Sequence, residues 1–396
     1  MPTPPRILLL TPAFPPASGG IERTAGELAG GLDDFHVEVV AGRPPESART
    51  GISAPERVRV HWTANEPPGG RRATAALLRR AVAVGLRFRP DLVLALHLRT
   101  APAARALRHL RGTRTVLVVH ASEVREQPAL ARAAVRWADA VVAVSGFARE
   151  LALESRAQPD HIRIISPGVE LPAVAPAPVA ARPRPLTVLT VARMNEAYKG
   201  HDVALAAMER LSPRVPGVRW IMVGDGPLRA ALREAAERKG LGDRVLFPGA
   251  VDDRALEEYF SAAHVFCMLS RAPRGQAAGE GFGIAFLEAA AHGLPAVAGR
   301  AGGAVDAVRD GVTGLLVDPE DPAAAALALE RLLTDVELAQ SFAEAAVERA
   351  RELTWPTVIE RYRKLISEVL AAPPRNQSSA DFAWLRDVAV GPRTGR

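Results

Sequence analysis

Cysteine is almost absent from this sequence, and long apolar runs are missing. The one cysteine, Cys267, lies in the apolar run 265–269, so it cannot form an internal disulfide, and we expect a small core side chain. No stretch approaches the ~20 apolar residues that a membrane-spanning helix needs. The apolar run Ile7–Leu10 is too short for the core of a signal peptide and is followed by prolines. We therefore expect a cytoplasmic protein.

Aromatic residues and lysines are also scarce. Aromatics make up 5% of the chain, and the positive charge is carried mainly by arginine. The arginines are concentrated between Arg71 and Arg114, where Asp91 is the one acidic residue. Because no aromatic interleaving or nucleic-acid-binding motif accompanies this basic segment, we expect no nucleic-acid partner.

The arginine-rich segment begins with an amphipathic helical pattern. At 100° per residue, four arginines fall within an arc of about 100°, and apolar side chains occupy the opposite side. Two interpretations remain open for this face. It is either a solvated surface or a surface that meets an anionic membrane or an acidic acceptor, with the protein at the inner membrane face. The four residues are Arg72, Arg79, Arg80 and Arg87.

The length of 396 residues is too great for one ordinary hydrophobic core. Short apolar runs such as Leu92–Leu96 and Thr115–Val119 alternate with helical patterns, which is typical of doubly wound α/β domains with parallel sheets. The Pro- and Ala-rich segment 171–185 has no periodicity and predicts a linker. We expect an N-terminal domain at 1–175, this linker, a second α/β domain at 186–355, a last helix at 356–371 and a disordered tail at 372–396.

The strongest signal for chemistry is the segment from Gly279 to Pro295. Three glycines in its first five positions let bare backbone approach a ligand, and the Ala- and Leu-rich run that follows predicts a helix that stops at Gly293. A glycine loop that opens a helix offers unpaired N–H groups and the positive end of the helix dipole, which suit a phosphate. Glu280 and Glu288 lie on either side of this place, where carboxylates can accept hydrogen bonds from sugar hydroxyls.

Two further predicted loops suit a diphosphate. Gly19 and Gly20 follow the first strand and open a helix, although an ordinary turn would explain them equally well. Arg193 and Lys199 are two cations on one loop, in a chain where lysine is otherwise rare. Such a pair can neutralise a departing diphosphate. Because the sequence has no D-x-D pattern, we expect no metal site.

His120 ends a predicted strand of the first domain. The carboxyl ends of parallel strands form the edge at which open α/β sheets bind ligands, so this histidine is a candidate for function as well as for a structural role. A G-x-S-x-G nucleophile motif is absent around Ser145.

The segment EGFGIAFLEAAAHGLP, with seven residues between Glu280 and Glu288, resembles the signature of the family-4 retaining glycosyltransferases of the GT-B fold. The resemblance extends to about residue 371. It implies two Rossmann-like domains that face each other across a cleft, and a last helix that returns to the first domain. It also implies a metal-independent reaction in which an arginine and a lysine hold the diphosphate of a nucleotide sugar.

Carried over to this chain, the resemblance gives each motif a role. His120 and Glu280 become the catalytic residues, with Glu280 at the transferred sugar and His120 stabilising that sugar by hydrogen bonding. The ribose and base are assigned to Glu288, Gly224 and Val251. The donor diphosphate is assigned to Gly19, Gly20, Arg193, Lys199, Gly281, Phe282, Gly283 and Ile284.

These features together predict a retaining glycosyltransferase. We expect it to move a hexose or N-acetylhexosamine from a UDP- or GDP-linked sugar to a hydroxyl of a small molecule, glycan or glycolipid, with no other cofactor. A nucleotide-sugar 2-epimerase remains an alternative, because it shares the fold but needs no acceptor. A peripheral membrane protein that has lost its donor site is a second alternative, against which the presence of both glutamates and both cations argues.

Overall fold

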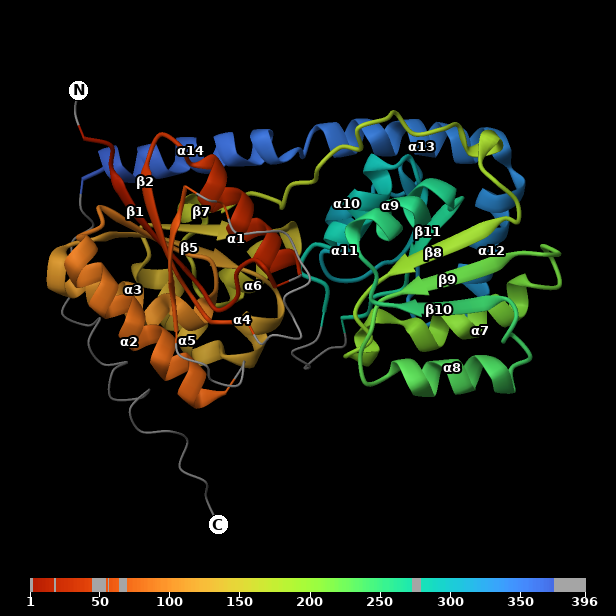
Figure 1. Cartoon of the computed structure of the whole chain (residues 1–396), viewed down its shortest axis with the longest axis horizontal. Coiled ribbons are helices and arrows are strands. Elements are labelled where there is room, and N and C mark those ends of the chain that lie inside the picture. The colour runs from red at the N-terminus through yellow and green to blue at the C-terminus, as the bar shows by residue number, and fades with distance from the viewer. Residues whose placement is uncertain are drawn as a thin grey trace, which may run out of the picture. The chain divides into compact units, whose positions relative to one another are not determined.

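The computed structural model describes residues 3–17, 19–44, 55, 57–63, 70–272 and 279–373. The chain divides into two compact units, each built on one parallel sheet (Figure 1). Unit 1 comprises Met1–Ile165 and Val358–Arg396, and unit 2 comprises Ser166–Thr357. The predicted α/β class with two parallel-sheet domains is therefore confirmed. The predicted tail lies, from residue 374 onward, outside the described residues.

Unit 1 has a seven-stranded sheet in the order β3-β2-β1-β4-β5-β6-β7. Its inner strands are largely buried apolar runs, and Ile7–Leu10 in β1 is fully buried, as expected of a sheet covered on both faces, whereas the edge strands β3 and β7 are partly exposed. The strand order reverses between β1 and β4, which is the switch point where such sheets bind ligands. The strands are β1 Arg6–Thr11, β2 His36–Ala41, β3 Arg59–Trp62, β4 Leu92–Ala95, β5 Arg114–Val119, β6 Ala140–Ala143 and β7 Ile162–Ile164.

Helices connect these strands, and Figure 1 shows α2 and α3 side by side. Their close packing depends on Gly85, where a Cβ would lie 2.5 Å from Leu107 Cδ1. The helices of unit 1 are α1 Gly20–Gly31, α2 Arg71–Phe88, α3 Ala101–Arg111, α4 Ser122–Glu126, α5 Pro128–Trp137 and α6 Gly146–Glu154, with short 3-10 helices η2 Leu98–Thr100 and η3 Pro159–His161. The last helix, α14 Trp355–Ala371, belongs to unit 1 from Val358 onward.

Helix α2 has the two-sided character that its sequence predicts. Leu77, Ala81, Val84 and Phe88 recur every three or four residues and are buried. All four arginines of the predicted basic face, named above, are exposed.

Unit 2 has a six-stranded sheet in the order β10-β9-β8-β11-β12-β13, with its switch point between β8 and β11. Trp220 is fully buried in its core, and its indole Nε1 donates to Thr190 Oγ1 over 2.9 Å. Cys267 is buried in β11, as predicted, and burial raises the pKa of its thiol. The strands are β8 Thr187–Val191, β9 Arg219–Val223, β10 Val245–Gly249, β11 Val265–Met268, β12 Ala296–Gly299 and β13 Gly314–Val317.

The helices of unit 2 cover both faces of this sheet. Figure 1 shows α7 and α8 on one side and α9, α10 and α13 on the other. The helices are α7 His201–Leu211, α8 Arg229–Arg238, α9 Asp253–Ala262, α10 Ile284–Ala291, α11 Ala304–Ala307, α12 Pro322–Thr334 and α13 Val336–Arg351, with the 3-10 helices η4 Val179–Ala181 and η5 Ala197–Lys199.

The segment 171–185, predicted to be a linker, falls within unit 2. Its Arg182 is buried and donates to Ala263 O (2.6 Å), at the end of α9, and to His292 O (2.6 Å), at the end of α10. A cation suits these carbonyl ends of helices, and the contacts tie the segment to the unit. Burial lowers the pKa of Arg182 to about 10, so the side chain remains charged at neutral pH.

Candidate active site

Lys199 lies at the end of the loop after β8, one of the two strands at the switch point of unit 2. The next residue, Gly200, has φ of 75°, and a Cβ there would lie 2.1 Å from the carbonyl oxygen of Leu269. Glycine at this position therefore lets the loop pack against the end of β11. This contact places Lys199 beside the residues that follow β11.

Lys199 and Glu280, predicted as separate donor contacts, meet in the structure. Lys199 Nζ donates to Glu280 Oε2 over 2.5 Å, and the side chains are only 16% and 12% exposed. Ser270 Oγ lies 3.5 Å from the same oxygen. Burial would lower the pKa of Lys199, but Glu280 and Tyr198 together outweigh this effect and raise it, with the Glu280 carboxylate acting most strongly. The lysine is therefore cationic at neutral pH, and a diphosphate that binds it must compete with Glu280.

Two glycines fix the backbone around Glu280. Gly303 N donates to Glu280 O over 2.8 Å, and a Cβ on Gly303 would lie 2.1 Å from the carbonyl oxygen of Gly281. Gly302 has φ of 58°, and its Cβ would lie 2.8 Å from Glu280 O. The turn after β12 can therefore pack against the Glu280-Gly281 backbone only because it carries glycine at both positions.

The predicted anion site lies at the start of α10. The N-cap residue of this helix is Gly283, which has φ of 93° and makes no side-chain capping hydrogen bond. The Phe282 side chain is buried, so this loop presents backbone rather than side chains. Phe286 N already donates to Gly283 O over 2.9 Å, so the N–H groups of Ile284 and Ala285 are those of the first turn that can bind an anion. Glu288 lies one turn further along α10 and is partly exposed.

Arg193, Gly224 and Val251 lie in the loops after β8, β9 and β10. The first two loops touch, since a Cβ on Gly224 would lie 2.0 Å from the carbonyl oxygen of Ala192. Gly224 N also donates to Gly249 O over 2.9 Å. Arg193 is exposed and pairs with no carboxylate in the part of the chain that the structure describes. All three residues therefore lie at the same sheet edge as Lys199, but Arg193 remains open to solvent.

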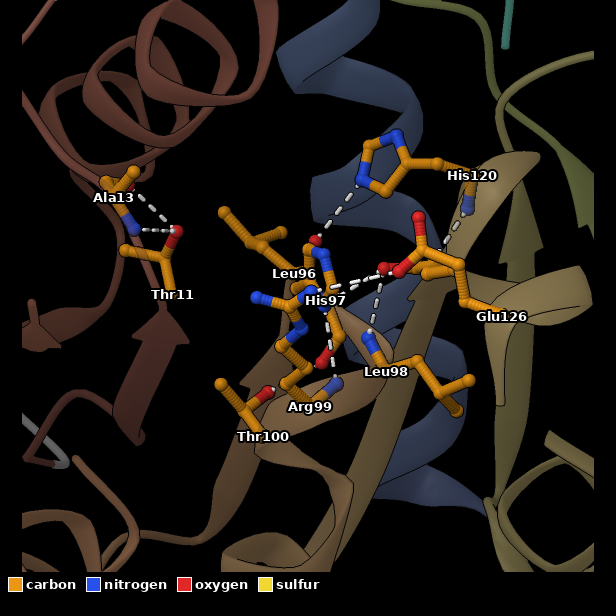
Figure 2. A network of polar contacts seen from close by, with 10 residues as sticks. Thr11, Ala13, Leu96, His97, Leu98, Arg99, Thr100, His120 and Glu126 are labelled. Atoms are coloured by element: carbon orange, nitrogen blue, oxygen red, sulfur yellow. Dashed lines mark hydrogen bonds and ion pairs between the residues drawn. The ribbon is translucent and has the colours of Figure 1, made fainter. Parts of the chain in front are cut away.

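In unit 1, His120 follows β5 and belongs to a polar cluster beside the switch point (Figure 2). Its ring Nε2 donates to Leu96 O over 3.0 Å, and its backbone N donates to Glu123 Oε1 over 3.1 Å. Glu123 is 1% exposed. Its Oε2 accepts from Leu98 N (3.2 Å) and lies 2.7 Å from His97 Nδ1. The structure thus surrounds the predicted histidine with a second histidine and a buried carboxylate.

Burial and charge act together on this cluster. Burial alone would raise the pKa of Glu123, but His97, His120 and the hydrogen bonds from them outweigh it and hold the pKa at about 2. Burial lowers the pKa of His120, although the Glu123 carboxylate acts in the opposite direction. At neutral pH the cluster therefore holds an ionised Glu123 and a neutral His120.

Gly19 and Gly20 lie at the start of α1, as predicted. A Cβ on Gly19 would lie 2.3 Å from Glu22 Oε2, so the carboxylate of Glu22 stands close to this helix end. A negative side chain is favourable there because of the helix dipole. A phosphate that contacts these glycines would meet the same carboxylate, so the predicted diphosphate contact requires Glu22 to move.

Neither a membrane-spanning helix nor a metal-ligating cluster is present in the described ranges. There, no helix combines the length and the apolar character needed to cross a membrane. Nor do those residues include a group of three or more His, Cys, Asp or Glu side chains that could hold a metal ion.

His97, Glu123 and Ser270 are site residues that the sequence reasoning missed. His97 follows the buried strand β4 in the same way that His120 follows β5, so the argument applied to His120 applies to it as well. The role of Glu123 depends on β4 and β5 being neighbours, which the sequence does not reveal. Ser270 follows β11, and the sequence around it contains no motif that would mark it as a site residue.

Comparison with known proteins places these features in context. The profile of glycosyl transferases group 1 matches residues 175–349, and that of glycosyltransferase family 4 matches residues 18–172. A GDP-mannose-dependent alpha-(1-6)-phosphatidylinositol monomannoside mannosyltransferase of Mycobacterium tuberculosis is 31% identical over 392 residues, which cover 92% of this chain and 97% of the relative. A D-inositol 3-phosphate glycosyltransferase of Acidothermus cellulolyticus is 35% identical over 241 residues, which cover 57% of this chain and 52% of that relative. Sucrose-phosphate synthase from Thermosynechococcus elongatus has a similar fold, with a TM-score of 0.78 at 22% identity over 93% of this chain and 100% of that one.

Proposed function

The chain belongs to glycosyltransferase family 4, and on this premise we propose that it is a retaining, metal-independent enzyme that transfers a hexose from a nucleoside diphosphate sugar to an acceptor hydroxyl. The observation that carries the proposal is the pair of Lys199 and Glu280 at the switch point of unit 2. The pair sets a cation suited to a diphosphate beside a carboxylate suited to sugar hydroxyls. GDP-mannose is the first donor to test, because the mycobacterial relative is named for its dependence on it.

The proposed reaction exchanges one bond for another on the same face of the sugar. The bond between the anomeric carbon and the diphosphate oxygen breaks, and the acceptor oxygen bonds to that carbon. The departing phosphate oxygen takes the proton of the acceptor hydroxyl, so no protein base is required. The cations Arg193 and Lys199 and the N–H groups at the start of α10 stabilise the negative charge of the leaving group.

The remaining residues are assigned by what they can bind. Glu280 accepts hydrogen bonds from the transferred sugar, and Glu288 accepts them from the ribose. In unit 1, His120 is proposed to hydrogen bond to the sugar at its reacting end. Because the two cations meet the charge of the diphosphate, the proposed reaction needs no divalent ion.

The exposed arginines of α2 support a further part of the proposal, in which the enzyme meets its acceptor at an anionic membrane surface. The mycobacterial relative is named as a mannosyltransferase for a phosphatidylinositol derivative. A lipid acceptor for this chain would agree with that name.

A nucleotide and donor panel tests the proposed activity. We expect GDP or UDP to raise the melting temperature, because a ligand at about 100 times its Kd stabilises the folded state by about 2.7 kcal/mol. The matching sugar nucleotide should then yield a glycoside with the anomeric configuration of the donor, determined by NMR, with and without EDTA. Phosphatidylinositol and its mannosides serve as the first acceptors.

The controls separate the rival functions. Conversion of the donor to an epimer without any acceptor would favour the epimerase. An inverted anomeric centre would contradict the retaining mechanism. If GDP, UDP and ADP all leave the melting temperature unchanged, a protein without a donor site becomes the better account.

A further inference from the structure

The Glu123 carboxylate joins the ends of two neighbouring strands of unit 1. It lies in the first turn of α4, and its two oxygens accept from Leu98 N, which follows β4, and from His120 N, which follows β5. A carboxylate that is 1% exposed is costly to bury unless each oxygen is satisfied, and here both are. The carboxylate is therefore built into the strand ends at the switch point.

The same carboxylate determines which nitrogen of His97 carries the proton. His97 Nδ1 lies 2.7 Å from Glu123 Oε2 and 3.0 Å from the backbone N of Arg99. One ring nitrogen cannot both donate to a carboxylate and accept from an amide. Because an ionised oxygen at 2.7 Å would repel a lone pair, Nδ1 holds a proton and donates to Glu123. Nε2 of His97 makes no hydrogen bond within the described part of the chain and is left for a ligand.

His120 presents the opposite nitrogen. Its Nε2 donates to Leu96 O over 3.0 Å, which leaves Nδ1 as an acceptor in the neutral ring. The two ring centroids are 6.3 Å apart (Figure 2). An acceptor nitrogen suits a hydroxyl that donates its proton, as sugars and polyol acceptors do.

We propose that Glu123 is the positioning residue of the transferase centre in unit 1: it fixes the Nδ1–H tautomer of His97 and anchors His120, so that both imidazoles face the substrate hydroxyls in one defined state. Glu123 acts through the two histidines and does not itself touch substrate. The predicted effect of Glu123 on turnover rests on the proposed function, whereas its predicted effect on the histidine tautomers does not.

The test replaces Glu123 by its isostere and follows the histidines directly. In the full chain labelled with ¹⁵N-histidine, long-range ¹H–¹⁵N spectra report the tautomer of each ring, and His97→Asn and His120→Asn identify the signals. The wild-type protein should show protonated Nδ1 in His97 and protonated Nε2 in His120. In Glu123→Gln, His97 should change to the Nε2–H tautomer, because Arg99 N already lies within hydrogen-bond distance of Nδ1.

Turnover provides the second readout. Glu123→Gln should lower kcat by roughly 10–100-fold, the loss typical when a carboxylate that orients a metal-bound histidine is removed, while the Kd for the nucleoside diphosphate stays within about twofold. Glu126→Gln is the matched control, since Glu126 is exposed on the same helix and pairs with Arg99 rather than with either histidine. It should change neither the tautomers nor kcat.

The outcomes distinguish this inference from the proposed function. An unprotonated His97 Nδ1 in the wild-type protein would overturn the inference without any variant, even if Glu123→Gln failed to fold. An unchanged kcat in folded Glu123→Gln would overturn it as well. The expected tautomers in a protein that transfers no sugar would support the placement of Glu123 and count against the transferase assignment alone.

Discussion

At the scale of single residues, the buried carboxylate of Glu123 and the partly buried carboxylate of Glu280 differ in what holds them. Glu123 is fixed by two backbone N–H groups and an imidazole. Glu280 instead pairs with the flexible ammonium group of Lys199, and Ser270 lies at the limit of hydrogen-bond distance. Glu280 can therefore exchange its partner when a ligand arrives, whereas Glu123 keeps its partners. This difference fits a substrate-binding role for Glu280 and a positioning role for Glu123.

Alanine substitutions separate the roles of the two predicted donor carboxylates. Glu280→Ala should reduce kcat while leaving the Kd for nucleoside diphosphate unchanged or tighter, because it removes the group that competes for Lys199. Glu288→Ala should weaken nucleotide binding by roughly tenfold or more, since a charged hydrogen-bond acceptor contributes about 1.5–3 kcal/mol. Calorimetric titration and initial rates give the two quantities. Weakened nucleotide binding in Glu280→Ala, with slow turnover confined to Glu288→Ala, would mean that the two assignments must be exchanged.

At the scale of elements, loops rather than helices or strands place the candidate site. Gly200, Gly302 and Gly303 let three backbone segments approach so closely that a Cβ at any of them would overlap a carbonyl oxygen. On the opposite side of unit 2, Arg182 fixes the C-terminal ends of α9 and α10. Helix α10 is thus held at its end by an arginine, while its start remains available to an anion.

Helix α2 allows a prediction about membrane contact. In the double variant Arg79→Glu/Arg80→Glu, binding to vesicles that contain anionic lipid should fall by roughly 30-fold or more, because each of the two basic side chains contributes about 1 kcal/mol near such a surface. Co-sedimentation with anionic and neutral vesicles measures the effect. Arg233→Glu/Arg238→Glu on α8 makes the same charge change at exposed positions of unit 2 and should have little effect. Equal, weak binding of the wild-type protein to both kinds of vesicle would contradict the proposed membrane contact.

At the scale of the whole molecule, the sequence predicts the elements well and their contacts poorly. The apolar runs Leu92–Leu96 and Thr115–Val119 match β4 and β5, and the last helix expected at 356–371 matches α14. Buried parallel strands and amphipathic helices leave a local pattern, so one sequence suffices to find them. The glycine loop at α10 is likewise visible, because its chemistry lies in consecutive residues.

Contacts between distant residues leave no such pattern. Arg182 donates to the carbonyls of Phe260 and His292, 78 and 110 positions away, and any residue supplies a carbonyl. Its place in a Pro- and Ala-rich segment therefore predicts a linker, whereas the side chain is buried in unit 2. His97 and Glu123 could be joined only once the order of β4 and β5 was known. The pairing of Lys199 with Glu280 likewise depends on the crossover between β8 and β11.

In the proposed enzyme, protein cations hold the diphosphate in unit 2 without a metal ion. Calorimetric titration of the full chain with GDP and UDP in the presence of EDTA tests it, with Lys199→Met as the variant and Lys239→Met, a lysine that pairs with Glu209 on the surface, as the matched control. The account predicts that the nucleotide binds in EDTA and that Lys199→Met weakens its Kd by roughly 10–100-fold, while Lys239→Met binds like the wild type. Binding that disappears with EDTA, or that survives unchanged in Lys199→Met, would contradict it.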